Sequence, residues 1–521
     1  MLPDALEALP QRTLRWVLLS VVALLVLRLG WMSDDAYISF RTVWNLVHGY
    51  GLTWNTDERV QAFTHPLWLF VIAAAHALTH EMYLTAMAVS VLCSLLAVHV
   101  VLRRLCSGNA AALGFVALLL CAQAVLDFTT SGLENPLSFL LVAVFCTQWL
   151  THPAGHRPLF GLMLTGGLLA LNRLDLVLLV GPALAIELWQ QRSMRSIGIA
   201  ALALLPLIVW ELFSLLFYGV PFPNTYYAKL NTGIPKAEYL AQGAVYLLDV
   251  AIRDPGTMLL LLLAVLAPLA FGSPRARLPL VIGLVAYIGY VVNAGGDFMQ
   301  GRFVSVPAFL AAILLAADCD RPRRADHDRT WLAVVAVALI SATRLIPLEA
   351  SDPPIRANGV ANERHYYVAE TGLIYHQRYR QVPFNHPWGK TGERMRQTPS
   401  QPVVVFNAIG FAGFAAGPDV HIVDQHALSD AFLARQPSTR PWRIGHFVRE
   451  LPAGYLASVA DGRNHLVDPA QRALFDDLQK VIRGPLLAPG RLAAIWRLNT
   501  RSAISAEFAP PADPLTVSPS R

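Results

Sequence analysis

The sequence predicts a polytopic α-helical membrane protein that is followed by a mixed α/β soluble domain. Hydrophobic residues make up 55% of the 521 residues and charged residues only 15%, whereas soluble domains carry about a quarter charged residues. Long apolar runs fill residues 16–346, and residues 347–508 have an ordinary soluble composition. The arginines gather at the ends of apolar runs, where they set membrane orientation. The net charge of +6 therefore does not indicate nucleic-acid binding.

About eleven spans are expected, since a crossing helix needs about 20 mostly apolar residues. They lie near 16–32, 83–105, 109–126, 136–150, 159–171, 174–190, 196–218, 257–271, 278–293, 303–317 and 331–346. No small-residue cleavage site follows the first run, so we expect a retained signal anchor. The apolar run 66–79 is short and bounded by His65-Pro66 and His80-Glu81. We expect it to lie at the interface or to re-enter the membrane.

The arginine-rich connections predict the orientation. With the N-terminus inside, the inner connections include Arg103-Arg104, 152–157, Arg192 with Arg195, Arg275 with Arg277, and 321–329. The outer segments are then 33–82, 127–135, 219–256, 294–302 and 347–521, and they contain most of the unusual polar residues. We therefore predict a bacterial inner (cytoplasmic) membrane protein with a cytoplasmic N-terminus and a periplasmic C-terminal domain.

Three parts are expected along the chain. Residues 1–346 form the membrane domain, and residues 347–508 form the soluble domain. Residues 509–521 form a Pro- and Ser-rich tail that we expect to be disordered.

The first outer segment opens with a pair of carboxylates. Ser33 is a plausible N-cap, which places Asp34 and Asp35 in the first turn of a helix. Glycines at 49 and 51 end this helix. Arg41 lies seven residues after Asp34, near the same face, and is expected to hold it by charge. The apolar side chains at helical spacing (Tyr37, Phe40, Trp44 and Val47) are predicted to lie on the membrane surface.

Adjacent carboxylates at a membrane surface suit general-base chemistry. A sugar hydroxyl must lose its proton as it attacks, and a carboxylate within hydrogen-bond reach can accept that proton. Two neighbouring carboxylates also raise one pKa of the pair. The alternative is that the pair only caps a surface helix.

The same segment carries a long family resemblance. The Asp-Asp pair precedes Ile-Ser-Phe-Arg at 38–41, Asn-Leu-Val-His-Gly-Tyr-Gly-Leu at 45–52 and Glu-Arg-Val-Gln-Ala-Phe-Thr-His-Pro-Leu-Trp at 58–68. This pattern resembles the first loop of the mycobacterial terminal β-arabinofuranosyltransferase family. The resemblance implies a GT-C fold, with decaprenyl-phosphoryl-arabinofuranose as the sugar donor.

Two further outer segments carry ionisable residues next to apolar spans. Glu134 lies in a Gly-Leu-Glu that resembles the family, and a carboxylate near the bilayer is functional by default; the alternative is a helix cap. Arg173 is a candidate ligand of the donor phosphate, or it pairs with Asp175 and marks a turn.

The block 221–229 (Pro-Phe-Pro-Asn-Thr-Tyr-Tyr-Ala-Lys) also resembles the family pattern. Its aromatic residues offer faces on which a sugar can stack, and its lysine offers positive charge where a phosphate leaves. The donor-site candidates in this block are Asn224, Tyr226, Tyr227 and Lys229. The alternative is an aromatic belt at the interface.

The turn Gly-Gly-Asp-Phe-Met at 295–299, with Arg302 after it, is again similar to the family. Asp297 and Arg302 are expected to project into the same outer cavity as the first loop. The alternative is a turn held by an Asp–Arg pair. Arg41, Glu134 and Arg173 complete the set of donor-site candidates.

The soluble domain is expected to contain strands at Pro402–Phe406, Asp419–Asp424 and Ala493–Leu498 and a helix at 468–482. Asp-Gln-His-Ala-Leu at 424–428 and Trp-Arg-Ile-Gly-His at 442–446 resemble the family's periplasmic domain. The resemblance implies that this domain helps to hold the acceptor. The acceptor-site candidates are His65, Trp68, Trp388, Asp424, His426 and His446, and the alternative is that such residues only form the fold.

No His/Cys/Asp cluster has strong metal-ligand spacing, so no cofactor is certain. A divalent ion (Mg, Mn or Ca) between carboxylates and the lipid phosphate is left open. All five cysteines lie in or beside the membrane half, so no disulfide framework is expected. No Walker loop, dinucleotide fingerprint or nucleophile elbow is present.

Together these features predict a glycosyltransferase that acts on the outer (periplasmic) face of the inner membrane. It would transfer a pentose, arabinofuranose by resemblance, from a polyprenyl-phosphate donor to an envelope glycan or protein. Asp34 is the expected base, with Asp35 second, and the phosphate would be stabilised by Arg173, Lys229 and Arg302 or a metal.

Three alternatives remain. The first is a GT-C enzyme for another lipid-linked sugar, such as mannose or aminoarabinose. The second is a non-catalytic protein of envelope or flagellar assembly. The third, a transporter, is disfavoured, because Arg28 and Glu211 are the main ionisable residues at mid-membrane.

Overall fold

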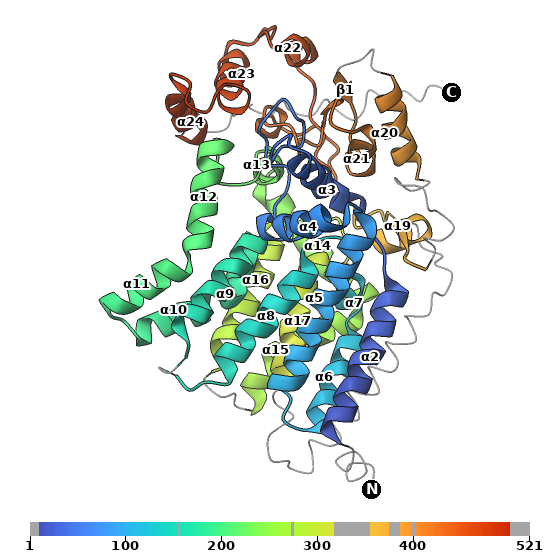
Figure 1. Ribbon diagram of the computed structural model, residues 1–521, viewed down its shortest axis with the longest axis vertical. Coiled ribbons are helices and arrows are strands. Elements are labelled where there is room, and N and C mark those ends of the chain that lie inside the picture. Colours follow the sequence, from blue (N-terminus) through green and yellow to red (C-terminus); the bar gives the residue numbers. More distant parts are fainter. Residues whose placement is uncertain are drawn as a thin grey trace.

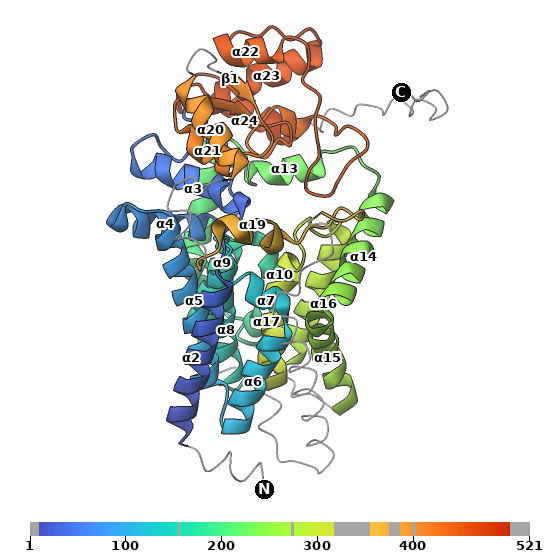
Figure 2. The same ribbon diagram turned by 90° about the vertical axis from the view of Figure 1, so that its right-hand side faces the viewer.

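The computed structural model describes residues 10–154, 157–271, 276–316, 355–374, 386–398 and 403–500. A helical bundle forms one part of the molecule, and a smaller domain sits on the end of the bundle that lies away from the N-terminus (Figures 1 and 2). The predicted span 331–346, the boundary between the two predicted domains at 346, and the tail 509–521 lie outside the described residues.

The bundle consists of apolar helices that pack side by side. They are α2 (Gln11–Leu29), α5 (Tyr83–Arg104), α6 (Asn109–Cys121), α8 (Asn135–Leu150), α9 (Leu159–Asn172), α10 (Val177–Gln190), α11 (Met194–Ala203), α12 (Leu205–Phe217), α15 (Pro255–Phe271), α16 (Leu278–Asn293) and α17 (Arg302–Ala316). Helix α5 packs on α8, α10 on α16 and α15 on α17. Leucines such as Leu24, Leu92 and Leu262 are exposed on the outside of the bundle, as expected for a surface that faces lipid.

Within the described residues, one helix is long and apolar enough to cross a bilayer by itself, namely α5. Two bent pairs add up to two more spans if each counts as one: α2 with α3 (Asp34–Val47), bent by 91°, and α11 with α12, bent by 58°. The other apolar helices of the bundle are shorter. The expected total of about eleven spans stays a prediction.

The basic connections at Arg103-Arg104 and Arg277 lie at the end of the bundle near the N-terminus (Figure 2). The predicted connection 321–329 lies outside the described residues. Arg103 and Arg104 end α5, and the Arg15 guanidinium donates to the carbonyl of Cys106 in the connection that follows. At the same end, the indole of Trp149, near the end of α8, donates to the carbonyl of Ala276 in the predicted connection that contains Arg277. The polar outer segments lie at the other end (Figure 2). The compartment of each end stays a prediction.

A layer of helices lies across the far end of the bundle, beneath the smaller domain: α3, α4 (Pro66–Thr79), α13 (Asn224–Leu230) and α19 (Glu363–Thr371) (Figure 2). Ser33 caps α3 by accepting a hydrogen bond from the Asp35 amide at 3.2 Å, as the sequence predicts. The short apolar run 66–79 forms α4, which ends at a left-handed His80. Helices α7 (Gln123–Asp127) and α14 (Lys236–Arg253) complete this end.

The prediction that the aromatic side of α3 faces the membrane is wrong. Tyr37 and Phe40 are fully buried. The Tyr37 ring packs edge-on against Phe411 and Phe414 of α21 (Phe411–Ala416), with centroids 4.9 and 5.2 Å away. The aromatic face of α3 is therefore covered by the smaller domain and not by lipid.

The smaller domain contains two short parallel strands, β1 (Val403–Val405) and β2 (His421–Val423), with Val403 opposite His421. Its other elements are α20 (Pro387–Gln397), α21, η3 (Leu433–Arg435), α22 (Tyr455–Asp461), α23 (Pro469–Ile482) and α24 (Arg491–Thr500). Both strands and α23 fall within their predicted ranges. The strand predicted at Ala493–Leu498 is wrong: this segment is part of α24, whose residues 491, 494 and 495 are buried at helical spacing.

Arg41 joins α3 to the smaller domain, and its expected contact with Asp34 is wrong. Its guanidinium donates to the carbonyls of Gly413 at 3.0 Å and Val420 at 2.8 Å. It also lies 4.1 Å from the ring centre of Trp54. Because it is 98% buried with these partners, Arg41 has a structural role and does not face the cavity described below.

We expect Arg41→Ala to destabilise the fold. The change leaves two buried carbonyls without donors, which costs on the order of 2–4 kcal/mol. Thermal unfolding in detergent, followed by a thiol-reactive dye that reports exposure of the buried cysteines at 93, 106, 121 and 146, should begin at a lower temperature. Arg396→Ala, at an exposed position of α20, is the matched control. Equal melting curves for both variants would contradict the structural role.

Candidate active site

A cavity of about 880 Å³ lies between the far end of the bundle and the smaller domain. Ionisable side chains of both charges line this cavity. The acids are Asp34, Asp35, Asp175, Glu211, Asp297 and Glu363, the permanent cations are Arg173, Lys229, Arg302 and Arg443, and the histidines are His65, His426 and His446. The segments that carry the paired acids and the Gly-Gly-Asp turn therefore meet in one cavity.

The two adjacent acids have different surroundings. The Asp34 carboxylate accepts hydrogen bonds from the backbone amides of Phe411 at 2.7 Å and Gly410 at 3.2 Å. Position 410 requires glycine, because a Cβ atom there would lie 1.9 Å from the Asp34 carbonyl oxygen. Burial raises the pKa of Asp34 to about 7, although the two amides oppose the shift.

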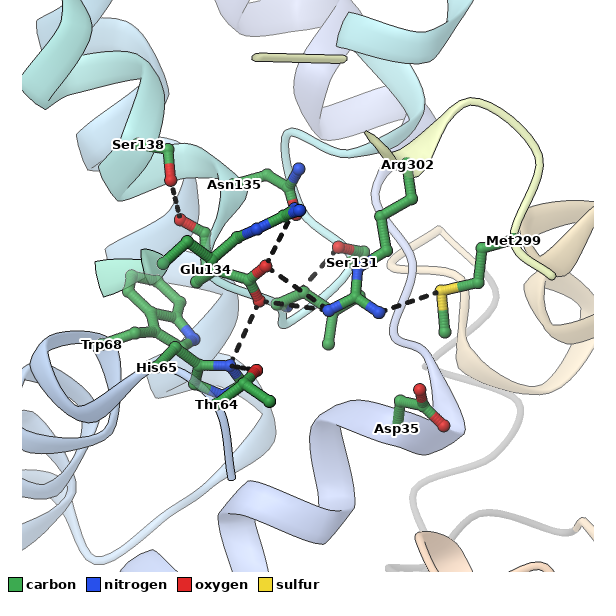
Figure 3. A network of polar contacts seen from close by, with 12 residues as sticks. Asp35, Thr64, His65, Trp68, Ser131, Glu134, Asn135, Ser138, Met299 and Arg302 are labelled. Atoms are coloured by element: carbon green, nitrogen blue, oxygen red, sulfur yellow. Dashed lines mark hydrogen bonds and ion pairs between the residues drawn. The ribbon is translucent and has the colours of Figure 1, made fainter. Parts of the chain in front are cut away.

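Asp35 presents the free carboxylate of the pair. No hydrogen bond to its carboxylate occurs within the described part of the chain, and its side chain lies across from Arg302 (Figure 3). Burial raises the pKa of Asp35, and the charges of Arg302 and Lys229 lower it. Asp35 is thus a partly buried acid that faces cations, and within the described residues none of them forms an ion pair with it.

Glu134 is not among the residues that line the cavity, but it contacts several of them and lies at the centre of the network in Figure 3. It is fully buried, at the N-terminal end of α8, and its carboxylate contacts His65 Nδ1 at 3.3 Å, Arg173 Nη1 at 3.4 Å and Arg302 Nη2 at 3.4 Å. Burial alone would raise the pKa of this carboxyl, but these three partners lower it to about 2. Glu134 therefore stays ionised and positions two arginines.

Arg173 is already paired. Its guanidinium donates to Asp175 through Nε at 2.9 Å and through Nη2, and it donates to the Tyr287 hydroxyl at 3.0 Å. The alternative expected from the sequence, a turn held by this Arg–Asp pair, thus describes its contacts well. Arg173 nevertheless lines the cavity.

Arg302 and Lys229 are less committed. Arg302 contacts Asp297 at 3.8 Å and Glu134 at 3.4 Å, both longer than an ordinary hydrogen bond. Within the described residues, the ammonium of Lys229 has no hydrogen bond or ion pair, and the residue is half-buried in the cavity wall. These two side chains can meet the charge of an anionic ligand.

The side of the cavity formed by the smaller domain and α19 is rich in rings. Trp388 packs against Tyr366, Tyr367 and His386, with ring centres 4.8 to 6.2 Å apart. His426 and His446 pack edge-on at 5.1 Å. Burial lowers the pKa of His426 to about 4 and that of His446 to about 3. Both rings are therefore neutral near pH 7.

His65 stands between the two acids and Glu134. Its Nε2 atom lies 2.8 Å from the Ser39 hydroxyl, on the helix of the paired acids, and its Nδ1 atom contacts Glu134. Burial lowers the pKa of His65 to about 4. His65 links the networks of α3 and Glu134 and also lines the cavity.

Four other predicted site residues do not reach the cavity, because their side chains hold the fold together. Asn224 donates to the carbonyls of Ala427, Leu428 and Asp430. Tyr227 stacks under Arg435 at 4.9 Å. The buried Trp68 donates to the Gly132 carbonyl, and Asp424 accepts from the amides of its own turn. Tyr226, by contrast, lines the cavity.

Two charged cavity residues, Glu363 and Arg443, were not among the site residues predicted from the sequence. Glu363 opens α19, and burial together with the nearby Asp35 raises its pKa well above the usual range. Arg443 lies in the Trp-Arg-Ile-Gly-His motif and donates to the Gly359 carbonyl. No local pattern marks Glu363: α19 reaches the site because Thr371 hydrogen-bonds Met32 and Ala361 pairs with Phe298.

Among the described residues, no group of three or more His, Cys, Asp or Glu side chains is placed to hold a metal ion.

Comparison with known proteins supports the resemblance seen in the motifs. A terminal β-(1→2)-arabinofuranosyltransferase of Mycobacterium tuberculosis is 27% identical over 512 residues, covering 80% of each chain. The chain is similar to this group of glycosyltransferases along most of its length. The enzyme of the same name from Corynebacterium glutamicum is 25% identical, covering 80% of this chain and 72% of its own. The predicted resemblance is thereby confirmed. No family model matches.

Solved structures also align with most of the chain. ArnT from Cupriavidus metallidurans bound to undecaprenyl phosphate aligns with a TM-score of 0.47 and 14% identity, covering 79% of this chain and 86% of its own. The oligosaccharyltransferase of Archaeoglobus fulgidus in complex with Zn and sulfate aligns with a TM-score of 0.44 and 13% identity, covering 78% and 62%.

We expect Glu134→Gln to lower kcat by on the order of 10²-fold, since a shift of about 1 Å in positioned groups costs that much. Without the carboxylate charge, Arg173 and Arg302 lose their shared partner. Steady-state sugar transfer measures the effect.

Glu187→Gln is the control, because Glu187 is equally buried and pairs with Arg157 at 2.7 Å. Both variants should lose stability, and only the change at 134 should lower kcat of the folded fraction. An equal loss of kcat in the two variants would contradict the positioning role.

Proposed function

We propose that this protein transfers a pentose, arabinofuranose first among the candidates, from a polyprenyl-phosphate donor to a hydroxyl of an envelope glycan or glycoprotein. The reaction would take place on the outer (periplasmic) face of the inner membrane, within a GT-C fold. One observation supports this most directly: the free carboxylate of Asp35 faces Lys229 and Arg302 across a cavity that has an apolar wall.

The apolar wall suits a lipid tail. It is formed by the short helix η1 (Leu174–Leu176) and the start of α10, by α12 and by α13, with the side chains of Leu174, Val177, Leu178, Trp210 and Leu230. Leu174 and Leu230 are also exposed on the outside of the molecule. A lipid-linked donor can therefore enter from the side, with its chain against this wall and its phosphate towards Lys229.

The chemistry follows from the opposed charges. Asp35 takes the proton of the acceptor hydroxyl, whose oxygen forms a bond to the anomeric carbon of the donor sugar. The bond between that carbon and the phosphate oxygen breaks, and the electron pair leaves with the polyprenyl phosphate. Lys229 and Arg302 stabilise the charge that develops on the leaving group. Direct attack inverts the anomeric centre.

This proposal assigns the proton transfer to Asp35 and reverses the order expected from the sequence. Both oxygens of Asp34 already accept backbone hydrogen bonds from residues 410 and 411. Asp34 then acts as a positioning residue, which fixes the start of α3 against the smaller domain.

The acceptor would approach from the smaller domain. Trp388 and Tyr366 offer ring faces for a sugar, and His426 and His446 offer neutral hydrogen-bonding groups. Glu363 and Arg443 can bind hydroxyl groups. These residues all line the same cavity as Asp35.

We expect Asp35→Asn to abolish transfer, with a loss on the order of 10²-fold or more in kcat. Asp34→Asn should retain more activity and lose stability.

In the unchanged enzyme, kcat/KM should rise with pH through the pKa of Asp35, because the base acts when deprotonated and burial raises that pKa above 3.8.

Transfer from a polyprenyl-phosphoryl pentose in proteoliposomes measures all of these effects. Full activity of Asp35→Asn would exclude the assignment. A panel of mannose, aminoarabinose and arabinofuranose donors identifies the sugar, and parallel assays with EDTA test whether transfer requires a divalent ion.

We expect Lys229→Ala to lower kcat/KM for the donor by on the order of 10- to 100-fold, the value of one charge-assisted hydrogen bond. Lys236→Ala is the control, since Lys236 is exposed and donates to the Asn293 carbonyl. Binding of the product polyprenyl phosphate should weaken in the first variant and stay unchanged in the second. Unchanged binding in both would remove Lys229 from the phosphate site.

A further inference from the structure

The smaller domain exposes an apolar surface beside the bundle, which we name the α24 surface. It consists of Leu486 and Leu487, in the loop before α24, and Leu492 and Trp496, which lie four residues apart on one side of that helix. Leu487 is 97% exposed, Trp496 71% and Leu492 69%. The opposite side of α24 is buried, so the helix has one packed face and one free apolar face.

The α24 surface is fixed to the outer end of α12. Arg491 is 99% buried and donates to the Phe217 carbonyl at 3.1 Å and to the Val481 carbonyl at 3.3 Å. Asn499 donates to the Gly219 carbonyl at 2.8 Å. In Figure 1, α24 lies directly beyond the end of α12.

Glycine is required at 219 for this close contact. Its φ is +81°, and a Cβ atom would lie 2.2 Å from the Val481 side chain. The segment after α12 therefore packs directly against α23 of the smaller domain at this junction.

The apolar face of α12 leads up to the same place. Its exposed residues recur at helical spacing and form a continuous stripe: Leu205, Ile208, Val209, Leu212 and Leu216. Such a stripe on an outer helix of the bundle is a lipid-facing surface. Because α12 ends at Phe217, the α24 surface begins where the stripe stops.

The composition of the segment fits the membrane interface. Tryptophan is enriched at the level of the lipid headgroups. Residues 485–500 contain no Asp or Glu. Of their two arginines, Arg491 is buried and Arg497 is paired with Asp477 of α23, so the exposed side of the segment is apolar.

We infer that the smaller domain carries its own membrane contact: the α24 surface inserts into the outer headgroup region, next to the lipid-facing side of α12. The occupant is the bilayer, identified by the continuity of the two apolar surfaces and by the absence of acids. The contact would hold the domain over the cavity, whose wall includes Trp210 of α12. This inference does not depend on the transfer chemistry.

Spin labels on the full-length chain in nanodiscs of phosphatidylethanolamine and phosphatidylglycerol test the contact. Leu487→Cys and Leu492→Cys carry the label. Val467→Cys is the control, because Val467 is 77% exposed in the same domain and lies about 20 Å away, at the other end of α23. Cys319→Ser is added to all three variants, since the other four cysteines are buried.

Labels at 487 and 492 should collide several-fold more often with oxygen, which dissolves in lipid, than with a water-soluble nickel complex. The label at 467 should show the reverse. Nickel accessibility at 487 and 492 equal to that at 467 would overturn the inference. Exclusion of both reagents would overturn it as well, because it would show that protein covers the surface.

A second measurement needs no label. Brominated lipids should quench the fluorescence of the wild-type protein more than that of Trp496→Phe. Equal fractional quenching of the two proteins would place Trp496 in water and contradict the contact.

Discussion

The candidate site depends on one buried carboxylate. Glu134 is fully buried, so its charge is tolerated because His65, Arg173 and Arg302 surround it. These partners come from the loop before α4, the end of α9 and the start of α17, which are far apart in the sequence. By holding all three, Glu134 joins helices of the bundle and sets the direction in which Arg302 meets the cavity. The ion pairs are therefore the framework of the site as well as its charge.

The smaller domain completes the site as well as covering it. Its amides at 410 and 411 bind Asp34, and its carbonyls at 413 and 420 bind Arg41, so α3 is held along its length. As a result, two adjacent acids of the same type have different environments. One is bound by backbone amides and the other is free in the cavity, a separation of environments that assigns different roles to paired carboxylates.

Local sequence signals predicted the elements well, and long-range contacts account for what they missed. The Ser33 cap, the short helix 66–79, the helix 468–482 and two strands follow from caps, length and periodicity within each segment. The hydrogen-bond partners of Arg41 could not be predicted, because they lie more than 370 residues away in the sequence. Glu363 was missed for the same reason. The segment 493–498 has the composition of a strand, yet its burial on α23 and α12 requires a helix.

The lengths of the contacts explain how a charged cavity can remain available to a ligand. Arg173 is bound tightly by Asp175 and Tyr287, so using it for a phosphate would break good hydrogen bonds. Arg302 is held only by contacts of 3.4 to 3.8 Å, and Lys229 has no partner within the described residues. A phosphate can recruit these two at little cost, since they gain shorter bonds than they lose. Arg302 and Lys229, which are loosely held, face the carboxylate of Asp35. Arg173, which is tightly held, supports the cavity wall through its bonds to Asp175 and Tyr287.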